Sequence, residues 1–189
     1  LNSKLESKDY MNWRSHADEI VHLINGIQAH PVLKEKLPLL PFQLLISFSP
    51  DKVLEQCFLE KGLPIMHAYH DYRGKSVNET VQKWCNLPAK SREQERMLFQ
   101  LFGYTDEPDS MILTYDRLYD YIFAVMGSND GMGKIPDCIS KTISDTPNLI
   151  LLGFDFDSWY LKLLLRAFKI HERKKGEKSV PVFAAPLHY

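Results

Sequence analysis

The sequence predicts an α/β fold in which a mostly parallel sheet is covered by helices on both faces. Apolar runs of strand length alternate with amphipathic helical segments along the chain, which is typical of βαβ units. The run FQLLISF at residues 42–48 is apolar at most positions, as expected of a strand buried on both faces of a parallel sheet. Residues 148–169 predict a strand, an acidic turn after Gly153 and a helix. Open α/β sheets use this unit to present a ligand site at their carboxyl edge.

Two helices are predicted before this first strand. Apolar side chains recur at helical spacing over residues 9–26, and Gly26 is a suitable end. Residues 30–40 predict a second, short helix that ends at prolines. We expect the longer of the two to cover one face of the sheet.

A start signal for the next helix follows the first strand directly. Ser49 is predicted to be the N-cap, with Pro50 at the first helical position and Asp51 in the first turn. Gly62 is predicted to end this helix.

Four more strands are predicted from apolar or alternating runs. They cover residues 64–72, 97–102, 149–154 and 180–185. Pro181 cannot donate to a strand ladder, so the last of them is expected to lie at an edge. The polar residues 73–96 predict a connection that holds a single helical turn.

Three helices are predicted among the later strands. They cover residues 114–125, 135–143 and 158–170. Thr114 is the expected N-cap of the first, and the glycine-rich residues 127–133 predict a flexible loop.

Composition and charge indicate one ordinary domain over residues 1–189. The chain is 44% hydrophobic and 25% charged, and its formal net charge of −1 gives no field that would attract nucleic acid or an anionic membrane. No apolar run is long enough to span a membrane and no signal peptide is visible, so we expect a cytoplasmic protein. The three cysteines, Cys57, Cys85 and Cys138, form no CxxC pair, so no structural zinc site is predicted.

Three segments, in this order, resemble the bacterial sirtuin-like (SIR2-like) domain of NAD-depleting anti-phage and other conflict proteins. The first is LPFQLLISFSPDKVLE at residues 40–55, similar to the strand and Thr-Thr-Asn-Tyr-Asp-x-x-Leu-Glu turn of that family. The second is FQLFGYTDEPDSMILTYDRLYDYI at residues 99–122, similar to a Leu-His-Gly strand end, an acidic loop and a helix that starts at Thr. The third is LILLGFDFDSWYLKLLLRAF at residues 149–168, similar to a Gly-Tyr-Ser-Leu-x-Asp-Trp segment. The resemblance implies a Rossmann-like fold.

The resemblance also implies that two catalytic positions have changed. Ser49 stands where active members have the Asn that helps to hold the nicotinamide ribose and the attacking water. Phe102 stands where they have the His that acts as general base, and a phenyl ring cannot accept a proton. We therefore expect a catalytically degenerate domain.

The positions that the resemblance assigns to nucleotide binding lie at three strand ends. They are Ser47, Ser49, Asp51, Gly103, Gly153 and Asp155. Asp155 replaces the usual Ser; a carboxylate repels a phosphate but can accept from ribose hydroxyls, and a plain turn residue explains it as well. NAD or ADP-ribose is the nucleotide that the resemblance implies, although no residue fixes a cofactor.

The family's first strand and its Gly-rich phosphate loop have no counterpart before residue 42. Since the chain also begins at Leu1, we expect it to be a fragment of a longer multidomain protein that lacks them. Its expected partners are proteins or further domains of that same chain.

Two enzymatic alternatives stay open. One is an NAD glycohydrolase with a rearranged site, in which Ser49, His67 or His70 positions the water. The other is a metal-dependent phosphohydrolase that uses Asp155 and Asp157. A metal shared by His67 and His70 is not expected, because the two side chains should point to opposite faces of a strand.

Overall fold

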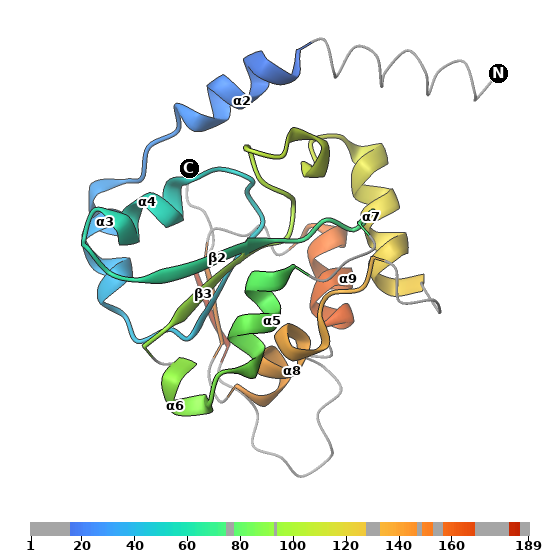
Figure 1. Ribbon diagram of the computed structural model, residues 1–189. Helices are drawn as coiled ribbons and strands as arrows, with labels where there is room; N and C mark the ends of the chain where they lie inside the picture. Colours follow the sequence, from blue (N-terminus) through green and yellow to red (C-terminus); the bar gives the residue numbers. More distant parts are fainter. Residues whose placement is uncertain are drawn as a thin grey trace, which may run out of the picture. The chain divides into compact units, whose positions relative to one another are not determined.

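A parallel three-stranded sheet forms the centre of the first of two compact units in the computed structural model (Figure 1). The structure describes residues 16–74, 78–92, 94–127, 133–146, 149–152, 157–168 and 182–185. The first unit takes in the chain up to Asp71 and residues Asn78–Leu113, and the second takes in the rest.

The strands of the first unit are β1 (Leu44–Ser47), β2 (Ile65–Tyr69) and β3 (Arg96–Gln100). Their order is β1-β3-β2, and β3 pairs with both neighbours in parallel. The register sets Ser47, Gln100 and Tyr69 in one row at the carboxyl edge. β3 is the most deeply buried strand because it lies between the other two and is covered on both faces.

Helices flank this sheet on two sides (Figure 1). On one side lie α3 (Pro31–Lys36), the 3₁₀ turn η1 (Leu37–Leu39) and α4 (Val53–Leu59). Their side chains close a core around Leu45, Phe58 and Leu98. On the other side α5 (Glu79–Asn86) packs against β2.

α2 (Ala17–Asn25) is the part of the predicted 9–26 helix that lies within the described residues. Its residues Ala17, Ile20, Val21 and Ile24 pack around the buried Met111. This apolar face has the spacing that the sequence predicts, since positions three and four apart share one side of a helix.

The second unit holds α7 (Tyr115–Gly127), α8 (Asp137–Asp145), α9 (Trp159–Ala167) and a parallel pair of strands, β4 (Leu149–Leu152) and β5 (Val182–Ala185). α7 packs against α9, and its buried face consists of Leu118, Tyr121 and Ile122. The Arg117 amide donates to Thr114 Oγ1 at 3.3 Å, which confirms the predicted cap.

The predicted α/β class is confirmed, and all five predicted strands are present and paired in parallel.

The predicted connection at residues 73–96 is wrong, because it contains α5 and a short helix, α6 (Ala89–Arg92). α5 begins after Asn78, whose side chain accepts from the Thr80 amide at 2.9 Å. It is held by the fully buried Trp84, whose indole nitrogen donates to the Glu95 carbonyl at 2.8 Å. α5 contains too few apolar residues for a helical spacing to be recognised in the sequence.

The part of the chain that the structure describes contains no helix both long and apolar enough to cross a membrane.

Candidate functional site

Polar side chains collect on one face of the three-stranded sheet, close to its carboxyl edge. Ser47, Gln100 and Tyr69 share the last row of the register, and His67 lies two residues before Tyr69 on β2. Since side chains alternate along a strand, all four project from the same face. Ligands of parallel α/β sheets bind at this edge.

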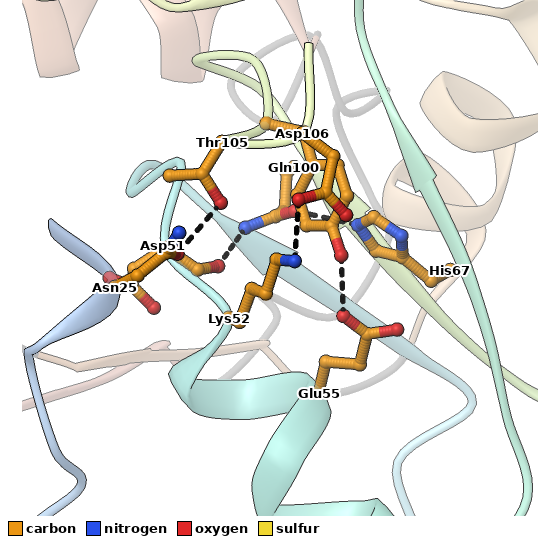
Figure 2. A network of polar contacts seen from close by, with 9 residues as sticks. Asn25, Asp51, Lys52, Glu55, His67, Gln100, Thr105 and Asp106 are labelled. Atoms are coloured by element: carbon orange, nitrogen blue, oxygen red, sulfur yellow. Dashed lines mark hydrogen bonds and ion pairs between the residues drawn. The ribbon is translucent and has the colours of Figure 1, made fainter. Parts of the chain in front are cut away.

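Gln100 is the central member of the group (Figure 2). Its side chain is fully buried, and its amide nitrogen donates to the carbonyl of Ser49 at 2.9 Å and to that of Asp51 at 2.6 Å. Its amide oxygen lies 2.6 Å from His67 Nε2. Both amide protons are therefore committed to the loop after β1, and the oxygen is left to accept from the imidazole.

This arrangement fixes the tautomer of His67. Because Gln100 offers only an acceptor at that point, His67 Nε2 carries the proton. In the neutral ring, Nδ1 then bears the lone pair that can take up a proton. The ring also packs against that of Tyr104, with centroids 4.3 Å apart.

Tyr104 joins the loop after β3 to α4. Its hydroxyl donates to Glu55 at 2.9 Å, and the Lys52 ammonium lies 5.4 Å from the centre of its ring. Burial, followed by the hydrogen bond to Glu55 and its charge, raises the pKa of Tyr104 well above the usual value. Tyr104 therefore stays a neutral donor, while Lys52 forms an ion pair of 2.5 Å with Asp106 (Figure 2).

The loop after β1 is closed by its own side chains. Ser47 Oγ accepts from the Ser49 amide at 3.1 Å, and the Ser49 hydroxyl donates to the Asp51 carboxylate. The other oxygen of Asp51 accepts from the Val53 amide at 2.8 Å. The predicted N-cap role of Ser49 is wrong, because α4 begins only at Val53 and Asp51 binds the free amide there.

Phe102 and Gly103 lie two and three residues after the end of β3. The Phe102 ring packs edge-on against that of Phe48, with centroids 5.3 Å apart. Gly103 has φ +85°, and a Cβ on it would lie 2.3 Å from the carbonyl oxygen of Ser110. Only glycine fits this turn, which accounts for Gly103 without a ligand.

The structure brings together some of the residues that the resemblance assigns to the site. Ser47, Ser49 and Asp51 surround the amide of Gln100, and their role in binding stays a prediction. Gly153 and Asp155 lie outside the described residues.

Sequence reasoning did not single out Gln100, Tyr104 or Lys52. A signal for Gln100 exists, since it interrupts the apolar run MLFQLF, and a polar side chain in a buried strand must find hydrogen-bond partners. For Tyr104 and Lys52 no local pattern exists. We refer below to Ser49, Asp51, His67, Gln100 and Tyr104 as the polar edge.

His70 points away from this group, as expected. Its ring lies 6.1 Å from that of Phe99, which alternates with Gln100 along β3 and so faces the opposite side. Within the described ranges, no three His, Cys, Asp or Glu side chains are placed to hold a metal ion.

The charges around the polar edge are mostly negative. Glu55 and Asp106 contact Tyr104 or Lys52, and Asp51 lies in the adjoining loop. Lys52 is the cation in this network, and it already pairs with Asp106. A ligand that donates hydrogen bonds, such as a sugar hydroxyl, fits these carboxylates better than a phosphate does.

Comparison with known proteins identifies a family model described as SIR2-like domain, which matches residues 44–186. This range contains all five strands. No curated protein matches the chain.

Proposed function

The chain belongs to the SIR2-like domain family, and from this membership we propose that it is a catalytically degenerate member. In this proposal the domain acts as a nucleotide-binding or protein-interaction module of a larger bacterial defence or signalling protein. NAD or ADP-ribose is the proposed nucleotide.

The observation that carries the proposal is the place of Phe102. By the resemblance of residues 99–122, it stands where active members of the family have their general base, and its ring packs on Phe48. An apolar contact of this kind stabilises the strand end but offers no group that can accept a proton.

The state of Ser49 also supports the loss of catalysis. The hydroxyl that would replace the family's Asn already donates to Asp51, and the Ser49 carbonyl accepts from Gln100. Reaching a ribose or a water would require the loop to give up these bonds. Polar side chains that satisfy one another in this way hold a loop in place.

In this proposal the charges around the polar edge decide which part of a nucleotide lies against which residue. The ribose hydroxyls would donate to Asp51 or Glu55, and the phosphates would need Lys52 to leave its ion pair with Asp106. That pair is partly exposed, so breaking it costs about 1 kcal/mol or less.

A second candidate function is an NAD glycohydrolase with a rearranged site. The observation that favours it is His67, whose Nε2 proton is held by Gln100 so that Nδ1 can serve as a base. This imidazole lies near the carboxyl edge of the sheet. It belongs to β2, which pairs with β3, the strand that precedes Phe102.

The test is calorimetric titration of NAD and ADP-ribose into the chain, with nicotinamide release followed in the same samples. Binding without release is the expected result. Release that falls about 100-fold in His67→Ala, but not in the surface control His30→Ala, would reject degeneracy and favour the hydrolase. Neither binding nor release would reject the nucleotide part of the proposal and leave the protein-interaction part.

A further inference from the structure

Two helices of the second unit present large apolar side chains to solvent. We call these side chains the aromatic stripe: Tyr115, Tyr119, Phe123 and Met126 of α7, with Trp159 of α9. The α7 members recur at intervals of three and four residues, so they lie on one side of the helix, next to the side that carries its buried residues.

The stripe continues from one helix to the other. The rings of Tyr119 and Trp159 stack, with centroids 5.1 Å apart and planes at 19°. α9 begins at Trp159 and packs against α7. The two helices therefore offer one joint surface, which contains side chains as exposed as Tyr115 at 73% and Phe123 at 74%.

The area of the stripe is large for a surface that faces water. Five side chains of this size and exposure leave on the order of 500 Å² of apolar surface accessible. This is about the size of the largest apolar patch on a typical monomer, roughly 300–600 Å², and such patches are often functional. A stable interface takes roughly 800 Å² from each partner, so the stripe supplies more than half of one.

Opposite charges border the stripe. Asp116 and Asp120 each come directly after a tyrosine of the stripe in the sequence. One residue is a rotation of roughly 100° around a helix, so both carboxylates lie on the side of α7 that is turned away from Trp159. Both side chains are exposed. One long side of the stripe is therefore acidic.

The other side of the stripe is basic. Lys162 and Arg166 lie three and seven residues after Trp159 on α9, so they share its exposed face. Lys162 is 4.0 Å from Asp157, and both side chains of that pair are highly exposed. Such an exposed ion pair contributes little to stability, so Lys162 can pair with a different carboxylate instead.

We propose that the aromatic stripe is the contact surface of a homodimer. A two-fold axis that runs along the stripe would place the apolar side chains of the two copies against one another. It would also set the acidic side of each copy opposite the basic side of the other, as a closed two-fold interface requires of a self-complementary patch. A second copy fits this pattern because the stripe carries both charges at once, whereas an acidic or a basic peptide would match only one side.

The first test compares two substitutions of equally exposed residues. Phe123→Glu places a charge in the middle of the stripe, and Leu23→Glu places one on α2, where Leu23 is 71% exposed. Light scattering coupled to size exclusion should give a dimer for the unchanged chain and for Leu23→Glu, and a monomer for Phe123→Glu. Circular dichroism should give the same helix content for all three.

A wild-type chain that stays monomeric at a concentration of about 100 μM would overturn the proposal, since a dimer that needs a higher concentration would be too weak for the stripe to be its contact surface. A dimer that both substitutions disrupt, or that neither disrupts, would place the contact elsewhere and overturn it too.

The second test concerns the orientation. Asp116→Lys with Asp120→Lys should weaken the dimer about tenfold through like-charge contacts, and adding Lys162→Glu with Arg166→Glu should restore it. If the charge-swapped chain stays as weak as the first variant, the axis along the stripe is refuted.

Discussion

The polar edge of the sheet and the aromatic stripe differ in where their side chains find partners. At the polar edge, Gln100 is buried and both ends of its amide are bonded within the same unit. On the stripe, Phe123 and Tyr115 are about three-quarters exposed. The side chains of the polar edge therefore find hydrogen-bond partners within their own unit, while the aromatic stripe leaves apolar surface exposed to water.

This difference shows which surface is the better candidate for a contact with other molecules. A ligand at the polar edge must compete with internal hydrogen bonds and the ion pair of Lys52 with Asp106. A partner on the stripe displaces only water from apolar surface, which is favourable by itself. We therefore expect nucleotide binding to be weak, and association through the stripe to be the stronger interaction.

The largest predicted effect concerns the turn that supports the polar edge. Gly103→Ala should destabilise the chain by about 4 kcal/mol, because it adds the strain of positive φ to a collision with the Ser110 carbonyl. Gly62 also has positive φ, but no atom lies within 4 Å of the position of its Cβ. Gly62→Ala should therefore cost only about 1 kcal/mol. Urea unfolding measures both, and equal losses would show that the collision is relieved.

The next prediction tests whether the polar edge stabilises itself. Gln100→Leu should lower the free energy of unfolding by about 3 kcal/mol, because the carbonyls of Ser49 and Asp51 and the His67 ring lose their partner. Gln82→Leu, at an exposed position of α5, should change it by less than about 0.5 kcal/mol. A loss below about 1 kcal/mol for Gln100→Leu would mean that water replaces the amide.

A smaller effect is expected at Tyr104. Tyr104→Phe should cost about 1 kcal/mol at pH 7, because it removes the donor to Glu55. The pKa of Tyr104 is raised in the folded chain, so the hydroxyl contributes its full stability below pH 10, the usual value, and loses it as pH rises further. The difference between the wild type and the variant should therefore shrink above pH 10. Unfolding measured from pH 7 to pH 11 decides this, and a constant difference would contradict it.

The smallest effect is expected on the stripe. Phe123→Ala should change the stability of the monomer by less than about 0.5 kcal/mol, since the side chain is already in water. By contrast, Phe58→Ala in the buried core should cost about 3–5 kcal/mol. Unfolding at concentrations that keep the chain monomeric compares the two. A large loss for Phe123→Ala would mean that the stripe packs within its own chain.

The strands were predictable because each one is a compact apolar run in the sequence. β1 and β2 lie within the predicted residues 42–48 and 64–72, and β3 begins one residue before the predicted 97–102. Burial on both faces selects such runs directly. α5 was missed for the opposite reason. It rests on Val81 and Trp84, and two apolar residues do not establish a helical period.

The polar edge was only partly predictable. Ser49 and Asp51 were named by the resemblance of a continuous segment, and His67 was named as a residue that could position the water of a hydrolase. Gln100 and Tyr104 were not named, because they lie at and after the end of another strand. Their contacts depend on the order β1-β3-β2, which puts β3 between strands that come earlier in the chain. The start of α4 was misjudged for a related reason, since Ser49 turns its hydroxyl to Asp51 instead of capping the helix.

The sequence by itself determined the α/β class, the parallel strands and the SIR2-like family. These follow from patterns between near neighbours, which hydrophobic burial and residue chemistry impose locally. Only the tertiary structure decided that Gln100 joins His67 to the loop after β1, and that α7 and α9 form one exposed apolar surface. Both features join residues separated by more than thirty positions, and the free energy that holds them appears only when the strands and helices pack.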